Sequence, residues 1–357
     1  MAKKSGKTSK RSSSVKRPKK LRAVQVGCGG RAQTHMDSML GSKAVDLVAI
    51  CDIDEKKLKA AGERFQIDRL YSSMEEMIQK EEPEFVDICT PPTIRTSIVG
   101  PAISAGAPAI LIEKPIALKP SESRKLVEWG EDRLIAVNTQ YQWMPHWQKF
   151  WPMLREGQLG EIRSIRCSTR ANILEQGPHT LDLALTAARV SGLPEPEWVM
   201  AGASGLVHFG DIPVPADTNA IAGLGETRLQ FTHGPSAPMV PGEDRGYAHI
   251  QVEVIGSKGR IWVSLAGGWT LWLNGKFSKG KTGWPKNDGE AQRAMYVHLR
   301  DAIHGGKEKE FPTRVELAAR NSDLMMACYV SALTNERVEL PAKLSDSIIR
   351  RLNKLER

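Results

Sequence analysis

Long apolar runs and clustered metal-ligating residues are both missing from this sequence of 357 residues. No stretch approaches the roughly 18 uninterrupted apolar residues that a membrane-spanning helix needs, and none follows the basic N-terminus as in a secretory signal. The eight histidines form no His-x-x-x-His or mixed Cys/His group. We therefore expect a soluble protein with no membrane span and no metal site.

Cysteine is scarce, and no Cys-x-x-Cys pair occurs. The five cysteines stand at Cys28, Cys51, Cys89, Cys167 and Cys328. An odd number of scattered cysteines is typical of free thiols in a reducing compartment. The sequence therefore predicts a cytoplasmic location.

Acidic residues are absent from positions 1–20, which hold nine of the 50 lysines and arginines. The other 41 basic residues match the 41 acidic ones, so the net charge of +9 arises in this segment and the body of the chain is neutral. A neutral body argues against a nucleic-acid binder. The segment is rich in Lys and Ser, which predicts a disordered basic tail. This tail is either a solubilising extension or a weak electrostatic contact to nucleic acid or an anionic surface.

Short apolar segments alternate with helical segments over residues 21–138. Strands are expected at 21–26, 45–51, 85–89, 109–112 and 134–138, with helices between them. Near-continuous apolar strands are typical of a sheet that is buried on both faces. This part of the chain therefore predicts a doubly wound parallel sheet, an α/β domain of the Rossmann type.

The pattern changes over residues 139–357. Strands of alternating polarity are frequent between 161 and 273, and helices are expected at 145–156, 179–190, 290–304, 314–333 and 344–355. Runs of strands bounded by helices predict a C-terminal α+β domain with a largely antiparallel sheet.

A glycine-rich turn joins the first strand to the first helix and reads G-C-G-G-R-A over residues 27–32. This G-x-G-x-x-A pattern between a strand and a helix is typical of dinucleotide binding. Gly27 permits the tight turn, Gly29 lets the backbone approach a pyrophosphate, and Ala32 leaves room for close packing of helix on strand. The N-terminus of the following helix supplies N–H groups for the phosphates.

The choice between NAD and NADP depends on the end of the second strand. Asp52 lies 25 residues beyond Gly27, where a carboxylate can accept a hydrogen bond from the ribose 2′-hydroxyl and repel a 2′-phosphate. Lys56 and Lys57 follow closely, and Arg31 lies in the turn; each can tolerate a phosphate. The sequence favours NAD and leaves NADP open.

Two further motifs follow strands of the same sheet. Thr90-Pro91-Pro92 comes after the strand at 85–89, and Glu113-Lys114-Pro115 after the strand at 109–112. Together with the glycine turn, they make residues 21–340 resemble the Gfo/Idh/MocA oxidoreductase family. The resemblance implies a nicotinamide-dependent enzyme, a small-molecule substrate that is a sugar, sugar phosphate or cyclitol, and an open sheet that often forms an interface. A homo-oligomer, either dimer or tetramer, is expected on the same ground.

The carboxyl ends of parallel strands meet at one crevice, so these motifs should lie together. The residues that we expect at the cofactor are Gly27, Gly29, Gly30, Arg31, Ala32, Asp52, Thr90, Pro91, Glu113 and Lys114.

Residues 175–182 resemble the family segment D-x-G-x-H-x-x-D, with Glu175 in place of the first Asp. Oxidation of an alcohol needs a base for the hydroxyl proton, and histidine has a suitable pKa. The resemblance therefore implies three catalytic residues. His179 is the base, Lys114 shares the proton and stabilises the developing oxyanion, and Glu175 orients a hydroxyl or the imidazole. Asp182 can also orient the imidazole of His179.

The leading hypothesis is hydride transfer between a nicotinamide cofactor and a secondary alcohol or ketone of a sugar-like or cyclitol substrate. A lyase or hydrolase that oxidises a sugar carbon transiently would instead turn over without net NADH. A third possibility is a non-catalytic regulator that senses the cofactor. The presence of both Lys114 and His179 argues against a regulator, and Glu175 in place of Asp keeps it open.

Overall fold

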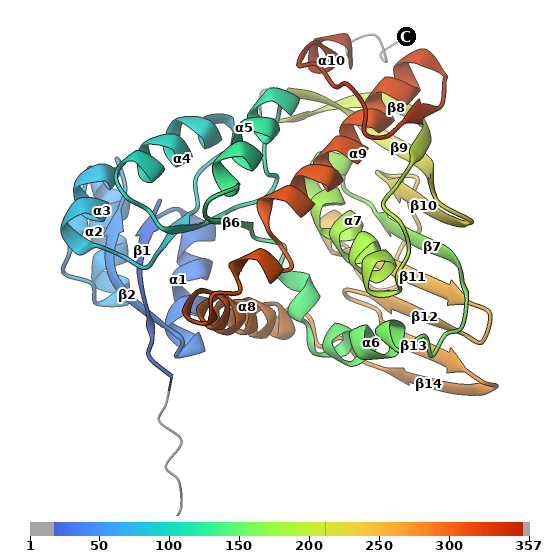
Figure 1. Ribbon diagram of the computed structural model, residues 1–357, viewed down its shortest axis with the longest axis horizontal. Helices are drawn as coiled ribbons and strands as arrows, with labels where there is room; N and C mark the ends of the chain where they lie inside the picture. Colours follow the sequence, from blue (N-terminus) through green and yellow to red (C-terminus); the bar gives the residue numbers. More distant parts are fainter. Residues whose placement is uncertain (1–17, 211, 353–357) are drawn as a thin grey trace, which may run out of the picture.

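The computed structural model describes residues 18–210 and 212–352, so residues 1–17 of the expected basic tail lie outside the described part. Two sheets of six and nine strands lie side by side, with the helices α7 (Ile173–Val190) and α9 (Val315–Thr334) between them (Figure 1). The expected α/β sheet followed by a largely antiparallel α+β part is confirmed. No helix in the described ranges is long and apolar enough to cross a membrane.

The first sheet is parallel and has the strand order β3-β2-β1-β4-β5-β6. Its strands are β1 (Leu21–Val26), β2 (Val45–Cys51), β3 (Leu70–Tyr71), β4 (Phe85–Ile88), β5 (Ala109–Ile112) and β6 (Leu134–Val137). The strands β4, β5 and β6 are buried along their whole length, as their apolar sequences predict. The order reverses between β1 and β4, which opens a crevice at the carboxyl ends of the strands.

The helices of this half cover both faces of the parallel sheet. They are α1 (Gly30–Ser42), α2 (Glu55–Phe65), α3 (Met74–Glu81), α4 (Arg95–Ser104) and α5 (Pro120–Gly130), with the short 3₁₀ helix η1 (Pro92–Ile94). Asp54 caps α2, because its Oδ1 accepts hydrogen bonds from the backbone N–H groups of Lys56 and Lys57 at 3.0 and 3.2 Å. The cap fixes the backbone of these two lysines, and Lys57 Nζ also lies 3.1 Å from Asp54 Oδ2.

The second sheet has the order β14-β13-β12-β11-β7-β10-β9-β8-β15, with β7 and β10 as its parallel pair. Its strands are β7 (Ile162–Thr169), β8 (Trp198–Phe209), β9 (Ile212–Leu224), β10 (Thr227–His233), β11 (Gln251–Gly256), β12 (Gly259–Ser264), β13 (Gly268–Leu273), β14 (Lys276–Gly280) and β15 (Val338–Glu339). The helices α6 (Pro145–Arg155), α7 and α9 cover one face of this sheet.

One expected helix begins earlier than the sequence indicated. The helix expected at 179–190 is α7, which starts at Ile173 because Asn172 Oδ1 accepts hydrogen bonds from the N–H groups of Leu174 and Glu175 at 3.1 and 2.9 Å. Gly-Pro pairs are common in turns, but Gly177 and Pro178 lie inside this helix. Glu175 and His179 stand four residues apart on it.

The C-terminal helices return to the parallel sheet. They are α8 (Lys286–Gly305), α9 and α10 (Ser347–Arg351), with the 3₁₀ helices η2 (Gln140–Trp143), η3 (Gly246–Ala248) and η4 (Glu308–Glu310) elsewhere in this half. The helix α8 packs against α1, and α9 packs against α5. Residues from both halves of the chain therefore surround the crevice.

Candidate active site

A cavity of about 610 Å³ lies at the carboxyl ends of the parallel strands, between the two halves of the chain. Nine of the predicted residues line it: Gly29, Gly30, Arg31, Ala32, Thr90, Pro91, Glu113, Lys114 and His179. The lining does not include Gly27, Asp52 or Glu175. The remaining wall is made by Cys89, Gln140, Tyr141, Gln176, Tyr247, Trp284 and Asp288.

The glycine turn has the shape that a pyrophosphate needs. Gly27 has a φ of +91°, and a Cβ at this position would lie 2.4 Å from the carbonyl oxygen of Cys89, so a side chain is excluded on both grounds. Gly29 and Gly30 face open space, since a Cβ on either would meet no described atom within 4 Å. The N-terminus of α1 begins at Gly30, so its free N–H groups lie at this opening.

Asp52 holds the glycine turn against the end of β2. Its Oδ2 accepts the N–H of Cys28 at 2.7 Å, and its Oδ1 accepts the N–H of Asp54 at 2.8 Å. A carboxylate has about four acceptor positions, so these bonds leave it able to receive a ribose hydroxyl.

Glu113 is the centre of a hydrogen-bond network rather than a free group at the cavity wall. Its Oε1 accepts hydrogen bonds from Arg31 Nε at 2.7 Å and Asn138 Nδ2 at 2.7 Å, and lies 2.8 Å from His35 Nε2. Its Oε2 accepts the N–H of Lys114 at 3.0 Å. Burial opposes ionisation, but Arg31 and His35 hold the pKa of Glu113 well below its usual value. Glu113 is thus an anion that fixes the start of the Lys114 loop.

His35 lies under this site and was not identified from the sequence. Its Nδ1 lies 3.1 Å from both carboxylate oxygens of Asp87, while its Nε2 faces Glu113. A ring with a carboxylate at each nitrogen carries a hydrogen on both, so it is an imidazolium. Burial would lower the pKa of His35, but Asp87 and Glu113 outweigh it and raise the pKa to about 9. Tyr296 of α8 donates to Asp87 Oδ2 at 2.6 Å and ties this network to the C-terminal half.

Lys114 crosses the cavity from β5 to α7. Its ammonium Nζ donates to the backbone carbonyl of Glu175 at 2.7 Å, and the following peptide bond, Lys114–Pro115, is cis. Burial lowers the pKa of Lys114, while Glu113 acts in the opposite direction. The ammonium has two further N–H groups with which to meet a substrate oxygen.

His179 is a buried neutral imidazole. Its ring stacks on Tyr141, with centroids 4.3 Å apart and planes 30° apart, and its Nδ1 has no hydrogen-bond partner in the described part of the chain. Burial and the nearby Lys114 lower the pKa of His179 well below its usual value. A neutral imidazole at the wall of a cavity can accept a proton.

The carboxylates of Asp182 and Glu175, which lie near His179 in the sequence, bond to groups other than its imidazole. The expectation that Asp182 orients the imidazole of His179 is wrong. The helix α7 points the carboxylate of Asp182 toward η2, where its Oδ2 accepts a hydrogen bond from Gln142 Nε2 at 2.7 Å. Glu175 contributes its carbonyl to Lys114, whereas its carboxylate receives Asn172 Nδ2 at 3.5 Å, back toward the helix start. The next residue, Gln176, is the one that lines the cavity.

The far wall of the cavity comes from residues distant in the sequence. Tyr247 and Trp284 meet edge to face with centroids 6.2 Å apart, and Asp288 in the first turn of α8 accepts Gln140 Nε2 at 2.7 Å. Sequence reasoning missed these residues, because no motif marks them.

Residues 21–137 match the family model described as "Oxidoreductase family, NAD-binding Rossmann fold", that of Gfo/Idh/MocA. Over these residues the chain is similar to the Gfo/Idh/MocA oxidoreductases. Among similar proteins, a D-apiose dehydrogenase of Paraburkholderia graminis is 33% identical over 40% of this chain and 38% of its own length. The chain thus aligns with less than half of that relative.

Longer alignments extend the likeness to the second half. An inositol 2-dehydrogenase of Corynebacterium glutamicum is 24% identical over 72% of this chain and 78% of its own length. The fold resembles that of an Agrobacterium radiobacter oxidoreductase solved with NAD+, L-tartaric acid and magnesium. That structure has a TM-score of 0.76 and 20% identity, and the match covers 90% of this chain and 98% of the other. The likeness of fold therefore extends over both sheets.

Proposed function

We propose that this protein is an NAD-dependent dehydrogenase or reductase that acts on a secondary alcohol or ketone of a sugar-like or cyclitol substrate. The observation that carries the proposal is the shared cavity: the glycine turn, Lys114 and His179 all line it. Similarity to apiose and inositol dehydrogenases supports the substrate class. In this proposal residues 21–138 bind the cofactor, and residues 139–357 supply the substrate wall and the oligomer contact.

The described residues fit a nicotinamide dinucleotide. Gly29, Gly30 and the start of α1 would hold the pyrophosphate, and Asp52 would accept the ribose hydroxyl, which favours NAD over NADP. When bound, the cofactor supplies the hydride acceptor or donor.

Proton handling falls to Lys114 and His179. The neutral imidazole of His179 takes the hydroxyl proton of the alcohol, and Lys114 donates a hydrogen bond to the same oxygen and stabilises its developing negative charge. General acid–base groups of this kind contribute roughly 10²- to 10⁴-fold in rate. The carbonyl of Glu175 holds the ammonium in place.

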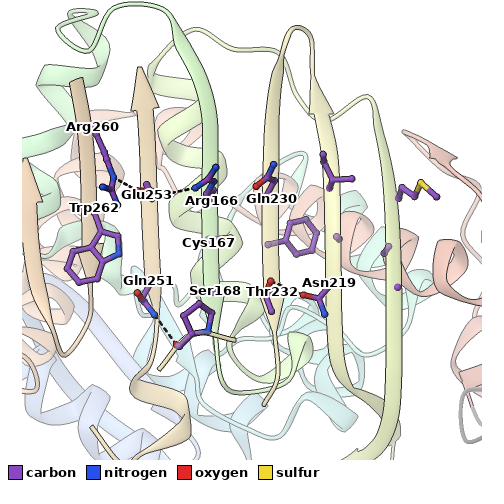
Figure 2. A pocket seen from close by; sticks show the side chains of 17 residues that line it. Arg166, Cys167, Ser168, Asn219, Gln230, Thr232, Gln251, Glu253, Arg260 and Trp262 are labelled. Carbon is purple, nitrogen blue, oxygen red and sulfur yellow. Dashed lines mark hydrogen bonds and ion pairs between the residues drawn. The ribbon is translucent and has the colours of Figure 1, made fainter. Parts of the chain in front are cut away.

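We also propose a homo-oligomer, a dimer or tetramer, formed through the open face of the nine-stranded sheet. Figure 2 shows this face, where outward side chains border a groove of about 820 Å³. Trp262 lines the groove, and Glu253 bridges Arg166 and Arg260 within it. Met200 also lines the groove and is 51% exposed. Light scattering on the purified chain tests this, and a monomer at micromolar concentration would contradict it.

A cytoplasmic location is the matching proposal for the compartment. All five cysteines are unpaired thiols, and four of them are buried. Proteins with free thiols are typical of reducing compartments.

The first experiment is titration of the purified chain with NADH and NADPH, followed by fluorescence transfer from tryptophan to nicotinamide. We expect NADH to bind more tightly than NADPH. A panel of polyols is then assayed for net NADH formation, with Lys114→Ala as the comparison. Binding of neither cofactor would refute the proposal, and substrate turnover without net NADH would favour the transient-oxidation alternative.

A further inference from the structure

The second half of the chain presents one ionised side chain to the cavity, and it is an acid. The wall residues that it supplies are Gln140, Tyr141, Gln176, His179, Tyr247, Trp284 and Asp288. His179 is neutral because its pKa is low. Asp288 is therefore the charge that a substrate meets on this side.

Two of the three cations near the cavity are paired with carboxylates, and the third lies at the proposed reacting centre. Arg31 is paired with Glu113 at 2.7 Å, and Lys114 is bonded to the Glu175 carbonyl beside the proposed reacting centre. Arg245 lies over the outer ring of Trp284, with its guanidinium carbon 4.4 Å from the centroid, and its charge is paired with Glu243 at 2.7 Å. Lys114 is bonded to a neutral carbonyl and keeps its charge, but it lies at the proposed reacting centre; a carboxylate or phosphate on the far end of a substrate would meet Arg31 and Arg245, whose charges are both paired.

Asp288 is held in place with one oxygen available. Gln140 Nε2 donates to Oδ1 at 2.7 Å, which fixes the carboxylate, while Oδ2 has no hydrogen-bond partner within residues 18–210 and 212–352. The first turn of α8 stabilises the negative charge through its N–H groups. A substrate hydroxyl can donate to Oδ2, whereas an anion placed there is repelled.

The aromatic residues beside Asp288 suit the same kind of ligand. Tyr141, Tyr247 and Trp284 offer ring faces and edges around the polar groups. Such rings pack on the C–H faces of sugars and cyclitols, leaving their hydroxyls to the polar side chains.

We propose that the cavity selects an uncharged polyol and that Asp288 is the specificity-determining residue, which accepts a substrate hydroxyl and rejects sugar acids and sugar phosphates. This inference rests on the proposed dehydrogenase function and names its substrate class.

The test compares matched ligands on the NADH-loaded protein by calorimetry and, with NAD, by turnover. Glucose is paired with glucuronate and with glucose 6-phosphate, and myo-inositol with an inositol monophosphate. We expect the uncharged member of each pair to bind and react at least about tenfold better. The variant Asp288→Asn should lower kcat/KM for the uncharged member about 10- to 100-fold, which is the loss typical of a hydrogen bond to a charged group. It should also reduce the preference for the uncharged over the anionic member of each pair.

A control variant separates this effect from a general change at the start of α8. Glu290→Gln removes a negative charge two residues away, from a side chain that pairs with Lys286 at 3.9 Å and does not line the cavity. Glu290→Gln should leave the preference for uncharged over anionic ligands unchanged. Both Asp288→Asn and Glu290→Gln should bind NADH as tightly as the wild type.

Equal or better binding of the anionic ligands, or an unchanged preference in Asp288→Asn, would overturn the inference. Turnover of an anionic sugar with NAD at least as fast as that of its uncharged partner would overturn it and leave the dehydrogenase function intact. Failure of every polyol to react would count against the dehydrogenase function, and the binding comparison would still decide the selectivity.

Discussion

Replacing His35 by asparagine tests whether the buried network below the cavity carries an ion pair. His35 and Asp87 are both fully buried, and Glu113 is 7% exposed, so the imidazolium lies between two carboxylates with almost no water. Breaking a buried pair by removing one partner costs about 3–5 kcal/mol, because the remaining charge is left uncompensated. We expect His35→Asn to lose about that much free energy of unfolding.

The free energy of unfolding lost in His35→Asn should depend on whether its partner Asp87 is still charged. In the double variant His35→Asn, Asp87→Asn one charge of each sign is removed, so the loss should be smaller than the sum of the two single losses by more than about 1 kcal/mol. The matched control is His304→Gln on the surface. His304 pairs with the partly exposed Glu84 at 3.2 Å, and such pairs contribute at most about 1 kcal/mol.

Equilibrium unfolding in urea at several pH values gives the assay. The folded pKa of His35 is raised to about 9 from 6.5, so its contribution to stability is complete below pH 6.5 and is lost as the pH rises through about 9. The wild type should therefore lose stability over this range, and His35→Asn should lose less. Parallel profiles for the two proteins, or a loss below about 1 kcal/mol in the variant, would refute the ion pair.

Three other predictions concern the cavity itself. Gly27→Ala should abolish NADH binding in the fluorescence titration, because its Cβ would lie 2.4 Å from the Cys89 carbonyl at a φ of +91°; wild-type affinity would contradict this. His179 should titrate well below pH 6.5 by NMR, and Lys114→Ala should raise its pKa by removing a nearby positive charge; an unchanged pKa would show that burial alone sets it. Asp52→Asn should narrow the preference for NADH over NADPH about tenfold or more in paired titrations, as expected when a carboxylate that repels a 2′-phosphate becomes neutral.

The parallel sheet and the position of the cofactor turn could be predicted because their signals are local. Each strand carries its own apolar run, and the turn at 27–32 stands between a strand and a helix in the sequence itself. The start of α7 was missed because Gly177-Pro178 is a strong turn signal. Asn172, five residues before that pair, is a weaker signal in the sequence than Gly-Pro. Its side chain nevertheless caps the helix and sets where α7 starts.

The far wall and the buried network could not be predicted, because their partners lie far apart in the chain. His35 and Asp87 are charged residues within a buried helix face and a buried strand, which signals that each has a partner, but nothing local says which. The same limit applies to Asp288, whose partner Gln140 is 148 positions away.

The helix α8 explains how these distant groups come to act together. Asp288, Gln292 and Tyr296 are spaced four residues apart, so they share one face of the helix. Along that face Asp288 meets the cavity, Gln292 bonds to Asn138 at 3.1 Å, and Tyr296 bonds to Asp87. A shift of α8 would therefore move the substrate wall and disturb the network that fixes the Lys114 loop at the same time. Because one rigid element touches both, the groups that would select the substrate and those that hold the reacting lysine are mechanically coupled.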